Sequence, residues 1–375
     1  MVHVDPTSTK AKPQIRQVEF NTISSSFGGL STHVAGLHRH LQHTGTYPEH
    51  TALKLSNQPE TNPTQALAQG LKAAHVAYGS SRSSTPLDLC VLFIVQDPER
   101  NIFDQRHLEY STQAQGIRVF RLPFSRVLSH TSIPGENPKR PLIFSPPQQP
   151  GKHYEVAVLY FRATYTPSDF PSARDWDARY HLERSAAIKC PSILTHLAGA
   201  KKVQQVLATP DSPHLSHFIP DVKVADALRD TFAAIYPMDD SPAGQKAKSL
   251  ALNPETAKGF VLKPQREGGG NNIYKEKIPG FLKQLGDEEK WRGHILMEII
   301  EPPAQENAIV REGKLLPGGV IAELGVYGTC LWRQGGEILH NEEAGYLLRT
   351  KGKESEEGGV AAGFGSVDSL LLVEV

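Results

Sequence analysis

A glycine-rich segment with flanking charges is the part of the chain best suited to bind a polyphosphate. Residues 263–274 read KPQREGGGNNIY, with three consecutive glycines at 268–270. Consecutive glycines expose backbone N–H groups and let a bulky anion approach the main chain closely. Lys263 and Arg266 supply positive charge, and Glu267 supplies a carboxylate for a metal ion. The pattern fits a polyphosphate with its metal, and a glycine-rich hairpin turn with solvated charges is the simpler alternative.

A pair of oxygen-bearing side chains lies near the start of the sequence. Residues 15–20, IRQVEF, alternate in polarity like a half-buried strand. On such a strand Glu19 and Asn21 point to the same face. Carboxylate and amide oxygens on one face suit Mg²⁺, a hard cation that prefers oxygen ligands. The spacing by itself favours the simpler alternative, a solvent-facing edge strand that ends in a serine-rich turn.

The C-terminal third places charged residues at the ends of expected strands. Glu298 follows the apolar residues HILM, Glu323 lies in IAELG, and Arg349 and Lys351 end a hydrophobic strand. An arginine there can hold a carboxylate or an acyl phosphate in a bidentate contact, and a lysine adds a point charge for phosphate. Charged strand ends are common, so this pattern alone favours an ordinary exposed edge.

Other suggestive patterns do not predict a site. His33, His38, His40 and His43 lie in one expected helix, but only the pairs His40/His43 and His33/His40 share a face. No cysteine or aspartate completes a zinc set, so a solvated helix is favoured. The sequence has no Walker A motif and no GxSxG elbow, and its glycine run does not match the dinucleotide motif GxGxxG.

Composition excludes several classes of protein. The 375 residues carry 40 Lys+Arg and 40 Asp+Glu, so no global field attracts nucleic acid or an anionic membrane, and neither partner is expected. Three cysteines without a CxxC pair argue against a disulfide framework and fit a reducing compartment. No apolar run approaches the roughly 18 residues of a membrane span, and the N-terminus has no signal-peptide core. A cytoplasmic protein is therefore expected.

Strands and helices alternate in the middle of the chain and indicate a small α/β lobe. The apolar run at 87–95 is typical of a parallel strand buried on both faces. Residues 116–124 look like the next strand, 155–162 like a third apolar strand, and 101–114 look helical. A serine-rich stretch at 80–86 predicts a flexible break before this lobe.

The segments around that lobe are expected to be helical before it and mainly antiparallel sheet after it. Helical patterns cover 31–44, 64–78, 174–208 and 221–250. Residues 130–151 are rich in proline and predict a loop. From Phe260 onward, short apolar runs alternate with glycine-rich turns, which predicts an antiparallel sheet with polar loops.

Several stretches in this order resemble the eukaryotic glutathione synthetase family. They are EFNTISSSFGGL, PERNIFDQR, YFRATY, LERSAAIKCPSILTHLAGAKKVQQ, LKPQREGGGNN, LMEIIEP, AELGVYG, GYLLRTK and GGVAAG. The resemblance implies an α/β (α+β) fold: a circularly permuted ATP-grasp with an inserted small parallel-sheet substrate-binding lobe and an antiparallel-sheet lid or ATP lobe. It divides the chain into a truncated N-terminal part of the core (1–85), a substrate-binding α/β domain (86–198) and an ATP-binding and lid region (199–375).

The activity that the resemblance implies is ATP-dependent ligation of γ-glutamylcysteine to glycine through an acyl phosphate. It also implies ATP as co-substrate, two Mg²⁺ ions per active site and a homodimer. A homoglutathione-type ligase with another amino-acid acceptor is an alternative. The family's chain has a longer start, which supplies a substrate-binding arginine and support for the strand that carries Glu19. An N-terminally truncated catalytic unit is therefore expected, and an inactive fragment is a further alternative.

The resemblance also implies roles for individual residues. The metal ligands are Glu19, Asn21 and Glu267. The catalytic residues are Arg349, Lys263 and Lys351. The residues for ATP are Glu19, Lys201, Lys263, Gln265, Arg266, Glu267, Gly268, Gly269, Gly270, Asn271, Asn272, Tyr274, Met297, Glu298, Ile299, Ile300, Glu323, Lys351 and Glu357. The residues for the dipeptide and product are Ile23, Ser24, Ser25, Ser26, Glu99, Arg100, Asn101, Gln105, Arg162, Tyr165, Arg349, Val360 and Ala361.

Four residues depart from the family's usual pattern. Ile299 stands where a lysine is frequent, and Glu357 replaces the usual aspartate before GGVAAG. Ala163 and Thr164 replace a more usual Asp-Gly. None of these changes removes a charge that the chemistry obviously requires.

Overall fold

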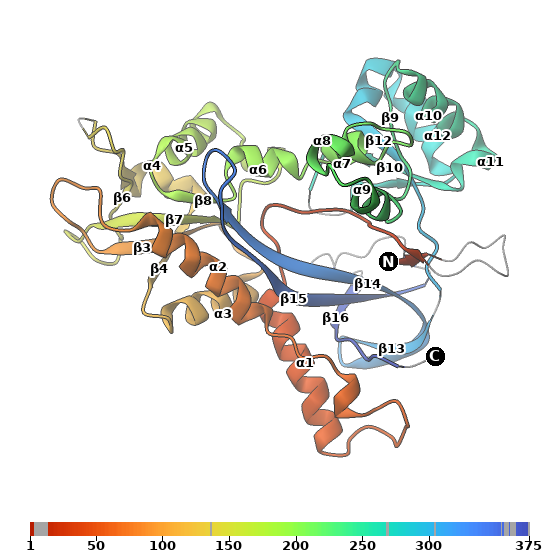
Figure 1. Ribbon diagram of the computed structural model, residues 1–375, viewed down its shortest axis with the longest axis horizontal. Helices are drawn as coiled ribbons and strands as arrows, with labels where there is room; N and C mark the ends of the chain where they lie inside the picture. The colour runs from red at the N-terminus through yellow and green to blue at the C-terminus, as the bar shows by residue number, and fades with distance from the viewer. Residues whose placement is uncertain are drawn as a thin grey trace. The chain divides into compact units, whose positions relative to one another are not determined.

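The chain forms a mixed α/β structure, as predicted, with both parallel and antiparallel sheets (Figure 1). The computed structural model describes residues 1–3, 14–135, 137–267, 270–303, 305–353, 355, 360 and 365–373. Two compact units are interleaved along the chain. Unit 1 comprises Met1–Thr22, His196–Glu323 and Thr350–Ser366, and unit 2 comprises Ile23–Thr195, Leu324–Arg349 and Val367–Val375. The three-part division predicted from the sequence stays a prediction.

The elements run along the chain as follows. The helices are α1 (Gly28–His43), α2 (Pro63–Tyr78), α3 (Ile102–Gln113), α4 (Val127–His130), α5 (Ala173–Arg184), α6 (Ile193–Ala198), α7 (Lys201–Ala208), α8 (Leu215–Phe218), α9 (Val222–Arg229), α10 (Pro242–Leu252), α11 (Pro254–Ala257) and α12 (Lys277–Leu285). The strands are β1 (Val2–His3), β2 (Gln14–Ile15), β3 (Leu89–Val95), β4 (Arg118–Pro123), β5 (Thr131–Ser132), β6 (Ile143–Phe144), β7 (Tyr154–Phe161), β8 (Ile188–Cys190), β9 (Ile235–Pro237), β10 (Phe260–Pro264), β11 (Ile273–Tyr274), β12 (His294–Glu298), β13 (Gln305–Arg311), β14 (Lys314–Trp332), β15 (Ile338–Gly352) and β16 (Gly365–Asp368).

Unit 2 is built on a sheet with the order β4-β3-β7-β6-β5, and β8 pairs with β7. Strand β3 pairs in parallel with β4 and β7, while β6 pairs antiparallel with β7. Alternate residues of the central strands enter two different apolar cores. Phe93 packs on the side of α2 and α3, and Phe161 on the side of α5. The predicted strands at 87–95, 116–124 and 155–162 are confirmed as β3, β4 and β7; β3 and β7 are buried on both faces, whereas β4 is only partly buried.

Unit 1 contains an antiparallel sheet with the order β11-β10-β12-β9. One face carries a core that includes Ala247 of α10 and Ile278 of α12 packed on Leu262 and Leu296. The opposite face carries a smaller apolar cluster that includes Val261, Ile295 and Met297. Because successive side chains of a strand alternate between faces, Lys263 lies on the same face of β10 as Val261.

A second antiparallel sheet, with the order β13-β14-β15-β16, occupies the C-terminal third. Its central strands are longer than the predicted short strands, at 19 residues for β14 and 15 for β15. Residues of both strands belong to each of the two units. Glycines within β14, such as Gly325 and Gly328, do not interrupt the strand. The glycines of this region therefore do not mark the ends of its strands, as the sequence had suggested.

One local prediction near the N-terminus was wrong. The predicted strand 15–20 is a strand only at β2, followed by an isolated bridge at Gln17. The chain leaves the sheet there because the Gln17 N–H donates to Thr231 O and Arg16 Nη1 donates to the carbonyls of Asp230 and Phe232. The segment is thereby fixed by the end of α9 rather than by a continuing ladder.

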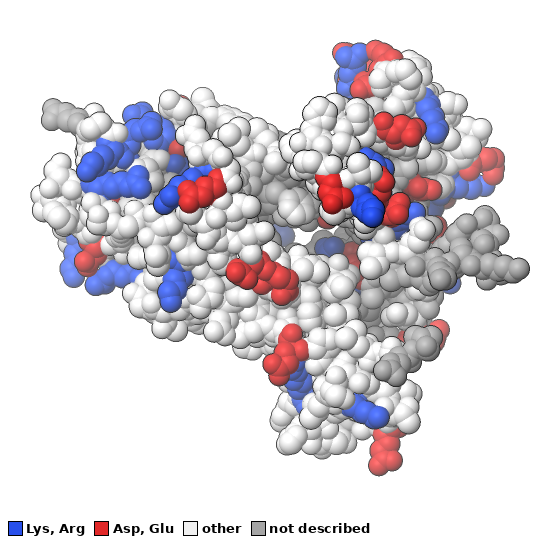
Figure 2. Space-filling view, in the orientation of Figure 1, with Lys and Arg blue, Asp and Glu red and all other residues white. Residues whose placement is uncertain are grey.

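The predicted flexible break at 80–86 and the loop at 130–151 are also corrected. The first is an ordered turn around the buried Glu155 carboxylate, and the second contains the short strands β5 and β6. Among the described residues, no helix is long and apolar enough to cross a bilayer. Acidic and basic side chains both occur on the face shown in Figure 2, with large uncharged areas between them, in keeping with the balanced composition.

Candidate functional site

Lys201 brings together two carboxylates that the sequence predicted as metal ligands. Lys201 is the first residue of α7, and its side chain is almost fully buried. Lys201 Nζ lies 3.4 Å from Glu267 Oε1 and 4.0 Å from Glu19 Oε2, and it donates to Arg266 O at 2.9 Å. The three positions are far apart in sequence, yet one ammonium group contacts both acids. All of them lie in unit 1.

Asn21, the third predicted metal ligand, makes a hydrogen bond to Glu19. Asn21 Nδ2 donates to Glu19 Oε1 at 3.2 Å, which leaves the amide oxygen of the exposed Asn21 side chain available. The set therefore offers two carboxylates and one amide oxygen, which are the hard oxygen donors that Mg²⁺ prefers. In the described part of the chain, no group of three or more His, Cys, Asp or Glu side chains is arranged to hold a metal by itself. A metal held here would thus need further oxygens, such as those of a phosphate.

Gln265 joins the end of β10 to the start of α7. Ala200, the N-cap residue of α7, makes no side-chain cap, and Gln265 Oε1 instead accepts from the Lys202 N–H at 2.9 Å. This contact satisfies one of the unpaired N–H groups that every helix start leaves. It fixes the beginning of α7, and hence Lys201, against the residues that follow Lys263. Arg266 is exposed beside it.

The apolar cluster on one face of β10 and β12 contains most of the predicted nucleotide-base contacts. Met297 is buried in it, and Tyr274, Ile299 and Ile300 pack against it. Lys263 lies directly opposite Ile295 in the β10–β12 register and is 6% exposed. A buried lysine beside apolar side chains suits a ligand with a flat apolar ring at one end and negative charge at the other.

The backbone of Glu298 and Ile299, next to this cluster, already makes hydrogen bonds within the protein. The Glu298 N–H donates to Ala234 O and the Ile299 N–H donates to Gly259 O, each at 2.9 Å. Asn272 Nδ2 donates to the Tyr274 hydroxyl at 3.3 Å, and Asn271 is half-buried. Any polar contact from residues 298–299 to a bound ring must therefore use groups other than those two N–H donors.

A separate ion pair in unit 1 joins two further predicted nucleotide contacts. Lys351 Nζ lies 3.4 Å from Glu323 Oε1, and both side chains are nearly buried. Gly270 has a φ of 72°, in the left-handed region that glycine tolerates, and Val360 is half-buried. The predicted residues Gly268, Gly269, Glu357 and Ala361 lie outside the described residues.

In unit 2, Arg162 holds the serine-rich loop that the sequence predicted for the dipeptide. Arg162 is 4% exposed, and its guanidinium donates to Ser25 O at 2.5 Å and to Ser26 Oγ at 2.9 Å. Ser24 Oγ donates to Phe161 O at 3.1 Å, where β7 ends. The start of the loop, Ile23, is buried in the unit 2 core. The loop and the arginine therefore form one hydrogen-bonded group at the end of β7.

Asp104 organises the end of this loop, and the sequence interpretation missed it. Its carboxylate accepts from the N–H groups of Phe27 at 2.7 Å, Gly29 at 2.8 Å and Leu30 at 3.1 Å. This is an N-terminal cap of α1 supplied from α3, and a carboxylate is favoured there by the helix dipole. Asp104 lies between the predicted residues Asn101 and Gln105 in sequence, and its position in the first turn of a helix was the available signal.

The predicted residues around α3 are linked by further hydrogen bonds. The Asn101 N–H donates to Glu99 Oε1 at 2.8 Å, and Gln105 Oε1 accepts from Arg121 Nη2 at 2.7 Å. Tyr165 accepts at its hydroxyl from Gln96 Nε2 at 3.1 Å, and Arg100 is exposed.

Two polar atoms among these residues are buried without a partner in the described part of the chain. They are Glu99 Oε2 and Arg162 Nε. An unsatisfied buried acceptor and an unsatisfied buried donor are costly in a protein without ligand. They suit a ligand that carries both an ammonium group and a carboxylate.

Thr164 shows how the chain accommodates one of its departures from the family pattern. Its φ is 71°, a left-handed conformation that is unusual for a β-branched residue but easy for the glycine expected there. Thr164 is fully buried, and its hydroxyl accepts from Arg179 Nη1 at 2.9 Å. The hydrogen bond offsets part of the backbone strain.

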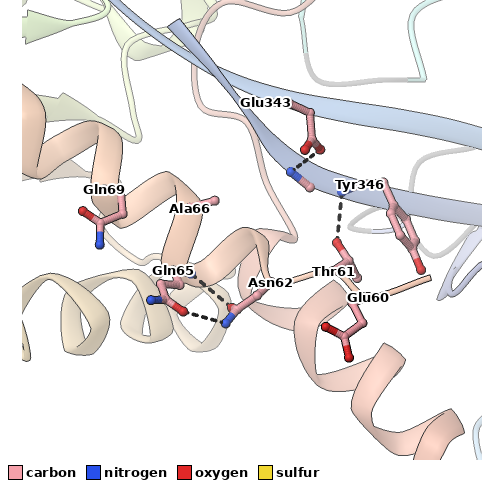
Figure 3. Close-up of a pocket in the computed structure, with 9 residues that line it drawn as sticks. Glu60, Thr61, Asn62, Gln65, Ala66, Gln69, Glu343 and Tyr346 are labelled. Carbon is pink, nitrogen blue, oxygen red and sulfur yellow. Dashed lines mark hydrogen bonds between the residues drawn. The ribbon is translucent and has the colours of Figure 1, made fainter. Parts of the chain in front are cut away.

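A pocket of about 360 Å³ in unit 2 contains none of the predicted site residues (Figure 3). It is lined by Glu60, Thr61, Asn62, Gln65, Ala66, Gln69, Glu343, Gly345 and Tyr346. Figure 3 shows that several of its polar groups are engaged locally: Asn62 caps α2 and Thr61 accepts from the Tyr346 N–H. The pocket is open and is not where the predicted chemistry gathers.

Comparisons with known proteins bear on the family to which the chain belongs. Residues 1–372 match the family model described as eukaryotic glutathione synthase, ATP binding domain. The chain is 42% identical to glutathione synthetase of Homo sapiens over 366 residues, which cover 96% of this chain and 71% of that protein. It is 38% identical to the glutathione synthetase large chain of Schizosaccharomyces pombe over 389 residues, with coverage of 100% and 74%.

A solved structure shows the same fold. A glutathione synthetase-like effector from Globodera pallida, in its apo form, superposes with a TM-score of 0.70 at 19% identity, over 98% of this chain and 74% of that one. The match of the family model over nearly every residue, and the identity to several synthetases, decide the relationship. The chain belongs to the eukaryotic glutathione synthase family.

Proposed function

We propose that this chain joins γ-glutamylcysteine to glycine with ATP, using the unit 1 residues around Lys201 and β10 for Mg-ATP and the unit 2 residues around Arg162 for the dipeptide. Members of its family are ATP-dependent ligases. The observation that carries the assignment is the meeting of Glu19 and Glu267 at the ammonium of Lys201. The buried Lys263 and the apolar cluster of β10 and β12 belong to the same unit.

The chemistry requires a carboxylate to become an electrophile. An oxygen of the cysteinyl carboxylate attacks the γ-phosphorus of ATP, ADP leaves, and an acyl phosphate forms. The glycine amine then attacks the carbonyl carbon, loses a proton, and releases phosphate. Positioning and charge neutralisation supply most of the catalysis in such a phosphoryl transfer.

The residues divide this work. Lys263 and Lys351 neutralise phosphate charge, and Arg349 holds the reacting carboxylate. Glu19, Asn21 and Glu267 would hold two Mg²⁺ ions, which neutralise phosphate oxygens when bound. Met297, Ile299, Ile300 and Tyr274 pack the base, while Lys201 holds the two acids in place.

Two buried polar atoms in unit 2 support the assignment of γ-glutamylcysteine to this unit. Glu99 Oε2 and Arg162 Nε are buried and lack partners among the described residues. A γ-glutamyl group carries an ammonium and a carboxylate on one carbon, so it could satisfy both kinds of atom. The Ser24–Ser26 hydroxyls would add hydrogen bonds to the peptide part.

The direct test is ADP release by the purified chain. ATP, Mg²⁺ and γ-glutamylcysteine are supplied with glycine, β-alanine or serine in separate reactions. Release that depends on both the dipeptide and glycine is expected. Faster turnover with β-alanine or serine would assign a homoglutathione-type acceptor instead, and no release with any acceptor would reject the proposed activity for this chain.

Assembly and location belong to the same proposal. A homodimer is proposed from the family relationship, and sedimentation velocity at several concentrations tests it, with a single monomer boundary counting against it. A cytoplasmic location is proposed because Cys90, Cys190 and Cys330 are all free, as in a reducing compartment. One relative, from Solanum lycopersicum, carries the name chloroplastic, so fractionation of a tagged chain should include plastids where the host has them.

A further inference from the structure

Tyr327, on β14, makes a hydrogen bond that nothing in its local sequence predicts. Its hydroxyl donates to Ser26 O at 2.6 Å, across 301 positions of sequence. Both residues lie in unit 2. Ser26 belongs to the serine-rich loop that Arg162 holds, so the phenol adds a contact from a second element to the same loop.

The loop needs such contacts because its backbone is strained. Ser24 has a φ of 52° and Phe27 a φ of 70°, both in the left-handed region that non-glycine residues seldom occupy. Strained conformations persist only where surrounding contacts over-determine them. Here Asp104 fixes the Phe27 N–H, Arg162 fixes Ser25 O, and Tyr327 fixes Ser26 O.

The surroundings of Tyr327 place it among the charged residues of the dipeptide region. Burial raises the pKa of the Tyr327 phenol, and the charges of Asp104, Arg162 and Arg349 also act on that pKa. The hydroxyl therefore stays protonated, and able to donate, throughout the neutral range. Arg162 and Arg349 are the two arginines that the proposed function assigns to γ-glutamylcysteine.

We infer that Tyr327 is a positioning residue for the dipeptide subsite: by fixing Ser26 O, its hydroxyl sets the direction in which the Ser24–Ser26 hydroxyl and N–H groups face the substrate. The residue acts through the loop and has no part in phosphoryl transfer. This inference rests on the proposed function, because it assigns the loop to γ-glutamylcysteine.

The test is Tyr327→Phe, which removes one oxygen and keeps the ring. Loss of a single buried hydrogen bond to the loop should raise the KM for γ-glutamylcysteine about ten-fold. The KM values for ATP and glycine, and kcat at saturating dipeptide, should stay unchanged. Tyr346→Phe is the matched control, since its hydroxyl donates to Pro59 O at 3.3 Å outside the loop. The control should change none of these constants.

A second measurement does not depend on turnover. Hydrogen exchange at the Ser26 and Phe27 amides should be faster in Tyr327→Phe than in the unaltered chain, and unaltered in Tyr346→Phe. Calorimetric titration with γ-glutamylcysteine should show the same ten-fold weakening as the KM. Melting temperatures of both variants check that each chain is folded.

The outcomes separate the two ideas. An unchanged KM for the dipeptide with unchanged exchange overturns the inference, as does an equal loss for all three substrates with a lowered melting temperature. If the unaltered chain releases no ADP with any acceptor, the proposed function fails. Exchange and dipeptide binding then still decide the role of Tyr327, and unchanged values there overturn it.

Discussion

Lys201 illustrates how one side chain can hold a site together in the absence of ligand. Two carboxylates near each other repel, and a shared ammonium group removes most of that cost. Glu267 lies 3.4 Å and Glu19 4.0 Å from Lys201 Nζ, and Asn21 makes a hydrogen bond to Glu19. Both acids are thereby held at one ammonium group, which reduces the ordering that metal binding would require.

Replacing Glu267 with glutamine tests this arrangement. The change keeps the shape but removes the charge of a proposed Mg²⁺ ligand, so we expect kcat to fall by at least about 100-fold, as loss of a preorganised charge often causes. Initial rates of ADP release measure the effect. Glu306→Gln, at an exposed position of β13, is the control and should retain normal turnover. A near-normal rate for Glu267→Gln would contradict its assigned role.

At the scale of elements, α1 begins only because α3 provides its cap. Phe27, at the N-cap position, makes no side-chain cap, and Asp104 of α3 accepts from three N–H groups there. The two helices approach so closely that a Cβ on Gly29 would lie 2.8 Å from Asp104 O and 3.0 Å from His107 Cβ. Glycine at this position is thus required by packing rather than by its backbone angles.

Two alanine substitutions in α1 separate packing from helix propensity. Gly29→Ala should destabilise the fold by about 1–3 kcal/mol, because the added methyl group forces α1 and α3 apart. Gly36→Ala, in the same helix, has no atom within 4 Å of its new Cβ and should stabilise by about 0.5–1 kcal/mol. Urea unfolding followed by circular dichroism measures both. Equal effects of the two substitutions would disprove the close contact.

At the scale of the whole molecule, buried polar groups join segments that are distant in sequence. Glu155 of β7 is fully buried and accepts from Tyr78 Oη, Ser81 Oγ, Ser83 Oγ and the N–H of Arg82. Burial by itself raises the pKa of Glu155, but these hydrogen bonds outweigh it and hold the pKa below its ordinary value. The carboxylate therefore attaches the turn after α2 to the central strand of unit 2.

The stability of the chain should depend on this carboxylate in a defined pH window. Since the folded-state pKa lies below the unfolded one, the contribution is complete above the unfolded value of about 4.3 and is lost as pH falls through the folded value. Glu155→Gln should destabilise the fold by about 1–3 kcal/mol at pH 7 and make stability less sensitive to acid. Urea midpoints at pH 7 and at lower pH measure this.

Glu49→Gln, at an exposed position, is the matched control for the Glu155 prediction and should leave both the midpoint and its pH dependence unchanged. A Glu155→Gln variant with an unaltered midpoint at neutral pH would show that the hydrogen bonds to Glu155 add nothing beyond those the unfolded chain makes with water.

The sequence alone determined the features that depend on local pattern and on motif. Periodicity indicated the strands β3, β4 and β7 and the helices α1, α2 and α3, and stretches such as LKPQREGGGNN indicated the family. The runs of β3 and β7 are apolar along their length because burial on both faces demands it. The site residues were named from the resemblance and stay a prediction; two of them, Glu19 and Glu267, both contact Lys201.

Tertiary structure decided what depends on partners far along the chain. Glu155 and Tyr327 have no local signature, and the place of Asp104 in the first turn of α3 does not reveal that it caps α1, since each of the three owes its role to donors or acceptors many positions away. The segment at 15–20 alternates like a strand, yet it pairs only briefly because the carbonyls of residues 230–232, just after α9, take its hydrogen bonds. Periodicity reports which face of a segment is apolar, but which neighbour satisfies its polar groups is settled only when the whole chain has folded.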